Sequence, residues 1–249
     1  MSSLIICPHC NGEIFDEPLE EPLNPTLTVV RKSKERGSWH DIAEGIANGR
    51  AHVMFDKRDS IECELKDGRK VIIDVADIDL YGNKEVIFCF RDAVAERRMN
   101  ESRTNRGGFV NAELNKWLNE DFFELLPDDL KEVISPRHIK QTINGTTFEC
   151  NSRIWIPSIV EVGGDDYREY GTDEEEKQFD LFKDKRNRIK LYDNEVCYWW
   201  ERSPYAGNST NFMYVYYNGN PSNGGTGASG AYAVVPCFFI RANDEDDDE

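Results

Sequence analysis

The chain has 249 residues, of which 39% are hydrophobic and 31% are charged, and its formal net charge is −17. This length and composition predict a folded globular protein with a sizeable core, built as one large domain or two small ones. The negative charge excludes sequence-independent binding to nucleic acids, which needs a basic surface, and it disfavours docking on an anionic membrane.

The N-terminal segment contains one pair of closely spaced cysteines. Cys7 and Cys10, in the sequence CPHC, resemble one knuckle of a zinc ribbon. A structural zinc site needs four ligands, and no second CxxC follows in the chain. Two interpretations stay open: zinc completed by His9, a distant cysteine or a second chain, or a pair without metal. The acidic, proline-containing stretch 16–25 is typical of a linker, so residues 1–25 are predicted to form a knuckle and linker.

Three helices are predicted from their start signals. Ser38 and Asp41 match a capping box, and apolar residues follow at helical spacing. Asn111 is predicted to cap a second helix, which carries Trp117. Pro127 is predicted as the first residue of a third helix.

Strands are predicted where β-prone runs are bounded by turn signals, among them Asp-Gly at 67–68 and Asn-Gly at 144–145. The predicted strands cover residues 60–65, 70–78, 85–90, 137–143, 146–150, 153–157, 211–217 and 232–240. Strands lie at both ends of the chain with helices between them. This order predicts an α+β fold with short antiparallel sheets and two to four helices.

Residues 205–231 contain no Asp, Glu, Lys or Arg, and we call them the charge-free tract. The tract holds six Gly, five Asn, four Tyr and three Ser. Tyrosine provides a large amphipathic contact area, while Ser, Gly and Asn provide adaptable hydrogen bonding, so this composition is typical of a recognition surface. Apolar segments flank the tract on both sides, which predicts that a rigid frame holds it. The alternative interpretation is a plain flexible loop.

A strand within the tract favours the recognition surface. Residues 211–217, NFMYVYY, are aromatic and β-prone. Alternation predicts Met213 and Val215 on one face and Tyr214 and Tyr216 on the other. The Asn-Gly pair that follows at 218–219 predicts a turn.

No catalytic motif is present in the sequence, so we predict that the protein is not an enzyme. Glu161, Asp165 and Asp166 offer oxygen ligands for calcium, but a solvated loop is the preferred interpretation. The acidic clusters at 173–176 and 244–249 are also predicted to be solvated and disordered.

Seven cysteines, mostly widely spaced, are predicted to be reduced thiols. With no secretory signal visible, we expect a cytoplasmic protein, with association with a virion as the alternative. Cys197 and Cys237 flank the charge-free tract and are predicted to meet on adjacent strands. Two interpretations follow for this pair: small buried hydrophobic residues, or thiol and copper chemistry.

The segment before the tract contains two tryptophans and an arginine. A guanidinium beside aromatic strand residues commonly anchors carbonyls or a carboxylate at the mouth of a loop. Trp199, Trp200 and Arg202 are therefore predicted to form the frame of the site.

Three segments in order resemble a bacterial and phage family with the pattern NxGGW…LRxWLN…WWLRSP…GVRPAF. They are NRGGF and LNKWLN at 105–119, WWERSP at 199–204 and VVPCF at 234–238. Phe109, Glu201, Val235 and Cys237 depart from the pattern. The resemblance covers roughly residues 61–240 and implies a C-type-lectin-like fold of the formylglycine-generating-enzyme type. We therefore expect one ligand-binding domain of that fold over residues 26–241, followed by an acidic tail at 242–249. The resemblance also implies frame roles for Trp117 and Pro236.

Some members of that family resemble the variable proteins of diversity-generating retroelements, in which a reverse transcriptase rewrites adenine-containing codons near the end of the gene. The resemblance implies a receptor-like protein with a hypervariable surface and a macromolecular ligand, a protein rather than a nucleic acid. It implies a fixed framework at Phe212, Val215, Gly219 and Pro221. The implied ligand contacts are Tyr205, Asn208, Thr210, Tyr214, Tyr216, Tyr217, Asn220, Ser222, Asn223, Thr226, Ser229 and Tyr232.

Two other functions stay open from the sequence. One is an oxidase like the formylglycine-generating enzyme, which would use Cys197 and Cys237. The other is a structural phage or prophage protein, in which the tract packs against another subunit. No cofactor is expected apart from the zinc considered for Cys7 and Cys10, and the oligomeric state is open.

Overall fold

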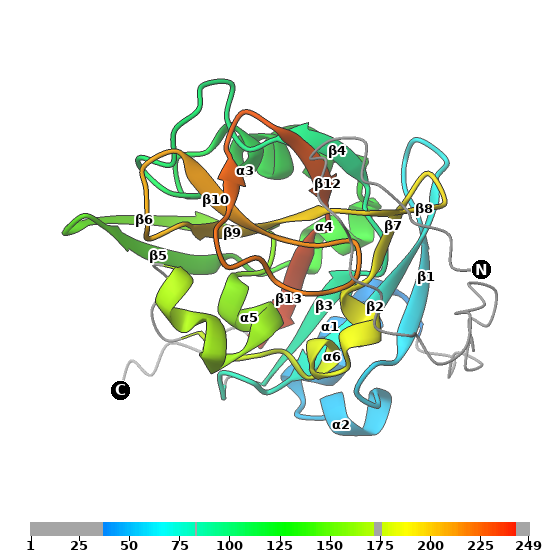
Figure 1. Ribbon diagram of the computed structural model, residues 1–249. Helices are drawn as coiled ribbons and strands as arrows, with labels where there is room; N and C mark the ends of the chain where they lie inside the picture. The colour runs from blue at the N-terminus through cyan, green and yellow to red at the C-terminus, as the bar shows by residue number, and fades with distance from the viewer. Residues whose placement is uncertain (1–36, 83, 172–175, 243–249) are drawn as a thin grey trace, which may run out of the picture. The chain divides into compact units, whose positions relative to one another are not determined.

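The computed structural model describes residues 37–82, 84–171 and 176–242, which form a mixed α+β structure with several short antiparallel sheets (Figure 1). The α+β prediction is therefore confirmed. Cys7 and Cys10, the proposed linker and the acidic tail from residue 243 onward lie outside the described residues.

A four-stranded antiparallel sheet joins the two ends of the described chain. Its order is β1-β2-β3-β13. The strands are β1 (Ser60–Glu64), β2 (Lys70–Ile78), β3 (Glu85–Phe90) and β13 (Cys237–Arg241). Figure 1 shows β13, in red, beside β3. Strands from the first and last parts of the described chain thus meet in one small sheet.

Helix α1 (Trp39–Ala47) covers this sheet with its apolar face. Ser38 and Asp41 form the predicted capping box, which satisfies free amides of the first turn. The Trp39 ring contacts Phe88 and Phe238 edge-to-face at centroid distances of 5.7 and 6.0 Å. These rings lie in the main hydrophobic core.

A five-stranded sheet contains the charge-free tract. Its order is β11-β10-β9-β12-β4, and its only parallel pairing within the described residues joins β12 to β9. The strands are β4 (Ala95–Arg98), β9 (Trp199–Pro204), β10 (Asn211–Val215), β11 (Thr226–Gly227) and β12 (Ala231–Val234).

Two hairpins and short helical segments complete the described structure. The hairpins are β5 (Arg137–Ile143) with β6 (Thr146–Ser152), and β7 (Lys190–Tyr192) with β8 (Glu195–Cys197). The α-helices are α2 (Ala51–Met54), α3 (Glu113–Trp117), α4 (Asp128–Val133), α5 (Ile159–Gly163) and α6 (Asp180–Lys183). A π-helical turn (Leu118–Phe122) and 3-10 turns (Phe123–Leu125, Asp165–Tyr170 and Lys185–Arg188) accompany them.

Four local predictions were wrong in detail. The strand predicted over residues 232–240 is two strands, β12 and β13, which belong to different sheets and are separated by Val235 and Pro236. Asn111 does not cap α3, because Ala112 is the N-cap and the Asn100 side chain accepts the hydrogen bond from the Glu113 amide. Pro127 is the N-cap of α4 rather than its first residue. Residues 153–157 form no strand: Trp155 makes an isolated bridge to Cys237 instead.

In the described ranges, the structure contains no helix with the length and apolar character needed to cross a membrane.

Candidate functional site

The charge-free tract is folded against the frame and is not a plain loop. Met213 and Val215 are buried and Tyr214 and Tyr216 are half-buried, as the predicted alternation requires. Phe212, on the tyrosine side of that pattern, is buried as well, because the register with β9 shifts between Phe212 and Tyr214. Strand β10 ends at Val215 because the chain then turns: the Tyr216 amide donates to the carbonyl of Asn220 at 2.8 Å. Phe212, Val215, Gly219 and Pro221, expected as fixed framework, are all buried.

Five half-buried tyrosines gather beside the five-stranded sheet, and we call them the tyrosine face. They are Tyr198, Tyr214, Tyr216, Tyr217 and Tyr232. Tyr198 lies at the centre, with the centroids of the other four rings 5.5 to 6.1 Å from its own. The rings of Tyr214 and Tyr216 lie 5.0 Å apart.

Tyr198 was missed in the sequence because it precedes the tract. The alternation of side chains along a strand was the available signal. Counting back from Trp200 would have placed Tyr198 on the same side of the chain.

Trp200 is the buried support of the tyrosine face. Its ring lies 4.7 Å from that of Tyr232, and its Nε1 donates to the carbonyl of Arg97 at 2.8 Å. Trp199 packs against Phe182 in the core, with its Nε1 donating to Arg188.

The other predicted frame residues differ in burial. Trp117 is half-buried, and the Arg97 guanidinium lies 4.3 Å from its ring centroid. Pro236 is buried, and its carbonyl accepts a hydrogen bond from Phe90 at 2.9 Å.

The loop between β9 and β10 is held by Asn105, which is only 1% exposed. Its Nδ2 donates to the carbonyls of Tyr205, Asn208 and Asn211 at 3.3, 2.8 and 2.8 Å. The backbone amide of Asn105 donates to the carbonyl of Ser209 at 2.9 Å. All four acceptors are main-chain atoms, so these bonds do not depend on which side chains the loop carries.

The two glycines of the NRGGF segment have backbones that favour glycine, with φ of +86° at Gly107 and +65° at Gly108. The turn they form lets the Phe109 amide donate to Oε1 of Gln141 at 2.8 Å. Nε2 of Gln141 donates in turn to the carbonyl of Arg202 at 3.2 Å. Two segments far apart in sequence are thereby joined through one glutamine.

The predicted ligand contacts differ in exposure. Most have an exposed or half-buried side chain: Tyr205, Asn208, Thr210, Tyr214, Tyr216, Tyr217, Asn220, Asn223, Thr226, Ser229 and Tyr232. Ser222 is the exception and corrects the prediction, because it is 1% exposed and its Oγ accepts hydrogen bonds from Gly224 and Gly225. It stabilises a turn instead of facing solvent.

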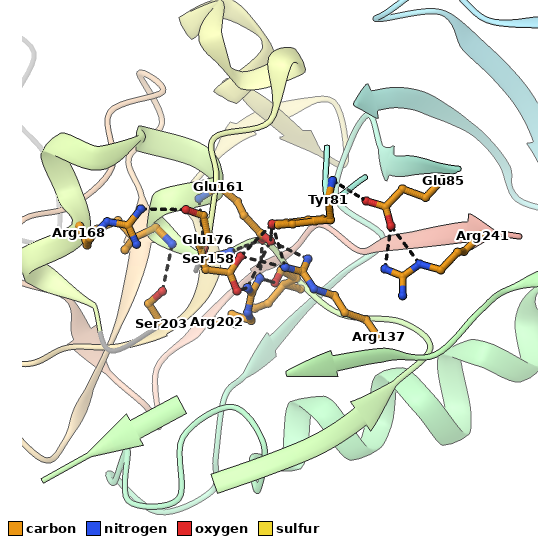
Figure 2. A network of polar contacts seen from close by, with 12 residues as sticks. Tyr81, Glu85, Arg137, Ser158, Glu161, Arg168, Glu176, Arg202, Ser203 and Arg241 are labelled. Carbon is orange, nitrogen blue, oxygen red and sulfur yellow. Dashed lines mark hydrogen bonds and ion pairs between the residues drawn. The ribbon is translucent and has the colours of Figure 1, made fainter. Parts of the chain in front are cut away.

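A buried charge cluster forms around Arg202, one of the predicted frame residues (Figure 2). Arg202 of β9 forms ion pairs with Glu161 of α5 and with Glu176. Arg137 of β5 pairs with the same two carboxylates at 2.6 and 2.9 Å. The Tyr81 hydroxyl lies 3.4 Å from Glu161 and 3.3 Å from Glu176. Arg202 therefore anchors carboxylates, and its Nη1 also donates to a carbonyl, at Ile156.

Two predictions about acidic residues were wrong here. Glu161 belongs to no solvated or calcium-binding loop: it is fully buried and completes the capping box of α5 with Ser158. Glu176 was assigned to a solvated cluster, yet it is only 8% exposed and is paired with Arg137 and Arg202.

The pKa values of the two carboxylates in this cluster are shifted in opposite directions. Burial disfavours the charge of Glu161, but Arg137 and Arg202 outweigh burial and hold the pKa of Glu161 well below its usual range. Burial, reinforced by the neighbouring Glu161 carboxylate, raises the pKa of Glu176 to about 7 in spite of the two arginines.

The cysteines are arranged differently from the predicted pair. Cys237 lies directly opposite Cys89 in the β13–β3 register, whereas Sγ of Cys197 donates to the carbonyl of Lys190 at 3.3 Å. Burial raises the pKa of the Cys197 thiol to about 12 and that of Cys237 well above its usual value. Protonated thiols are poor nucleophiles and metal ligands. In the part of the chain that the structure describes, no three His, Cys, Asp or Glu side chains are placed to hold a metal ion.

Comparison with known proteins gives one match. No curated protein and no solved structure matches the chain. A family model described as a domain of unknown function, DUF6273, matches residues 84–242, which is more than half of the chain. The matched region contains all five strands of the sheet that carries the tract, together with Asn105 and the buried charge cluster apart from Tyr81. The chain therefore belongs to the DUF6273 family.

Proposed function

We propose that this protein is a ligand-binding, receptor-like protein that recognises its ligand through the tyrosine face and the exposed residues of the charge-free tract. One observation carries the proposal: an uncharged, tyrosine-rich tract is folded onto a sheet and still leaves its polar and aromatic side chains accessible. Rigid aromatic side chains lose little conformational entropy on binding, which makes them effective anchors.

The charge-free tract is held through its backbone and its buried framework residues, so its exposed side chains can be substituted without loss of these contacts. The Asn105 amide holds main-chain carbonyls, and the framework residues Phe212 and Val215 are buried in the main core. Residues such as Asn220, Asn223 and Ser229 are exposed. We propose that the scaffold is C-type-lectin-like and that a diversity-generating retroelement varies these exposed positions. The ligand is a macromolecule, a protein, because the tyrosines form a broad surface.

Binding can be tested by capture of partners from the source cells with the full chain. The double variant Tyr214→Ser/Tyr216→Ser removes two rings of the face, so the bound partner is expected to be lost. The control is Val53→Ser, which alters a 74% exposed apolar residue on α2. Partners that bind all three proteins equally, or a stable assembly of the chain that buries Tyr214 and Tyr216, would contradict the proposal and favour a structural role.

Diversification has a separate test in DNA. We expect a nearby repeat of the segment that encodes residues 205–231, with differences confined to adenines. Sequencing of many copies of the gene should then show substitutions at exposed tract positions and none at Phe212 or Val215. Absence of a repeat, together with an invariant tract, would remove the retroelement from the proposal and leave the binding role to be judged by capture.

A further inference from the structure

Two buried cysteines face each other across strands β3 and β13. Cys89 and Cys237 are directly opposite in the antiparallel register, and both side chains are 0% exposed. The other cysteines in described strands lie opposite residues of other kinds: Cys63 opposite Val71, Cys150 opposite Ile139 and Cys197 opposite Lys190. Within the described residues, the strand register therefore contains one cross-strand pair of thiols.

The backbone hydrogen bonds at this position point away from the facing cysteine. Cys237 exchanges both of its backbone hydrogen bonds with Trp155, at 2.7 and 3.0 Å, on the side of β13 away from β3. The next residue along β3, Phe90, donates its amide to the carbonyl of Pro236 at 2.9 Å. Because amides alternate in direction along a strand, the Cys89 amide points towards β2 instead. Cys89 and Cys237 thus form a non-hydrogen-bonded pair, in which Cα atoms typically lie about 4.5 Å apart and side chains are closest.

This geometry suits a disulfide between the two strands. Disulfides join Cα atoms about 4.4 to 6.8 Å apart. Directly opposite residues of an antiparallel pair also project from the same face of the sheet. Burial raises the pKa of the Cys237 thiol, and a hydrogen bond with Cys89 adds to this shift, so the two thiols lie within reach of each other. The bond can therefore close without a change in the register of β3 and β13.

We propose that Cys89 and Cys237 are the site of a cross-strand disulfide, which closes when the chain folds in the presence of a small disulfide oxidant such as oxidised glutathione. One thiolate attacks the oxidant, which forms a mixed disulfide and releases one reduced glutathione. The second thiolate attacks the protein sulfur of that mixed disulfide and releases another. The two protein thiols lose two electrons and two protons, and one oxidised glutathione is reduced to two thiols.

Burial determines when the bond can form. The thiolate is the nucleophile in disulfide exchange, and a fully buried thiol with a raised pKa is neither accessible nor ionised. The folded, reduced protein is therefore expected to react slowly, whereas the unfolded chain exposes both thiols. Once closed, the buried bond is shielded from reductants in the same way.

The disulfide would enclose the part of the chain that carries the tyrosine face. The charge-free tract and all five strands of its sheet lie between Cys89 and Cys237. A cross-link that closes a loop of roughly 150 residues stabilises mainly by restricting the unfolded chain. The oxidised protein is therefore expected to unfold at a higher temperature than the reduced one.

The test refolds the full chain in two buffers, one with oxidised and reduced glutathione and one with a reducing agent alone. Free thiols are alkylated, and trypsin then releases residues 85–91 and 203–241, whose only cysteines are Cys89 and Cys237. Mass spectrometry should find the two peptides joined after oxidative refolding and separate after reductive refolding. If both cysteines are alkylated after oxidative refolding, or if they are joined mainly to glutathione or to other cysteines, the proposal is wrong.

The unfolding temperature provides a second measurement. The oxidised wild type should unfold on the order of 10 °C above the reduced protein, whereas Cys89→Ala and Cys237→Ala should lose this difference. Cys197→Ala is the matched control, because it removes a cysteine with no thiol opposite it and should keep the difference. Cys7 and Cys10 are present in every variant, so a bond between them cannot separate the variants from the control.

A difference that survives in Cys89→Ala, or an oxidised wild type that is no more stable than the reduced one, would overturn the proposal. The peptide measurement uses the wild type alone, so it decides the question even if an alanine variant does not fold. Neither measurement involves a ligand, and the result is therefore independent of the binding role proposed above.

Discussion

At the scale of single residues, Asn105 shows how one buried amide can organise a surface loop. A side-chain amide has two N–H donors, and Nδ2 of Asn105 lies within hydrogen-bonding distance of three carbonyls, those of Tyr205, Asn208 and Asn211. The loop lies far away in sequence, so no local pattern predicts the contact. The same segment had been singled out by its resemblance to a family motif, without a physical role for its asparagine.

Asn105→Ala is expected to destabilise the protein, because it leaves buried carbonyls without their donor. The expected loss is on the order of 3 kcal/mol of unfolding free energy, measured by denaturant titration. Limited proteolysis should show new cleavage within residues 205–211. Asn223→Ala, at an exposed position, is the control and should change the free energy by less than about 0.5 kcal/mol. Equal stability of the two variants would show that the loop keeps its conformation without the hydrogen bonds from Asn105.

At the scale of elements, the Gly107-Gly108 turn connects the segment before α3 to β5 and β9. Gly108 combines a positive φ with a close approach: a Cβ there would lie 2.3 Å from Oε1 of Gln141. That oxygen accepts from Phe109, and the same side chain donates to Arg202. The turn is therefore coupled to the frame through Gln141.

Gly108→Ala should cost about 3 kcal/mol or more in unfolding free energy, because it adds backbone strain and displaces Gln141. The matched control is Gly68→Ala in the β1–β2 hairpin. Gly68 also has a positive φ, of +85°, but nothing lies within 4 Å of the added Cβ, so only the strain of about 1–2 kcal/mol is expected. A comparable loss in both variants, measured by thermal or denaturant unfolding, would mean that Gln141 can move away without cost.

At the scale of the whole described structure, the buried charge cluster connects elements that come from distant parts of the chain. Arg137 lies on β5, Glu161 on α5 and Arg202 on β9, while Tyr81 follows β2 and Glu176 precedes α6. Figure 2 shows these five side chains converging, with the Glu85–Arg241 ion pair close to Tyr81. Removal of one partner would leave buried charge uncompensated, which is costly.

The opposite pKa shifts in this cluster predict a pH dependence of stability. The pKa of Glu176 is raised from 4.5 to about 7, so between these values the folded protein binds more protons than the unfolded chain. The contribution of Glu176 therefore falls as pH rises from about 4.5 to 7, by on the order of 1 kcal/mol per pH unit. The depressed pKa of Glu161 acts in the other direction, since its contribution is present above pH 4.5 and is lost as pH falls further.

Glu176→Gln removes the contribution of Glu176 to the pH dependence and leaves that of Glu161 in place. Denaturant unfolding between pH 5 and pH 8 should show a smaller decrease of stability with rising pH in this variant than in the wild type. Glu195→Gln, at an exposed glutamate of β8, is the control for the change in net charge and should keep the wild-type slope. An unchanged slope in Glu176→Gln would show that Glu176 is ionised throughout this range.

The sequence by itself determined the features that depend on neighbours in the chain. The capping box at Ser38, the hairpins at Asp67-Gly68 and Asn144-Gly145, and the alternation in residues 213–216 follow from local hydrogen bonding and side-chain period. The boundaries of the charge-free tract could also be read from the sequence, because they are defined by residue composition alone.

Tertiary structure decided where the polar and aromatic side chains of the site lie. It brought Tyr198 into the tyrosine face, turned Ser222 inward, buried Glu176 between two arginines and placed Cys89 opposite Cys237. Each of these outcomes depends on partners from other strands or helices. The free energy of burying a polar or charged group is set by those partners, which the residues next to it in sequence do not reveal.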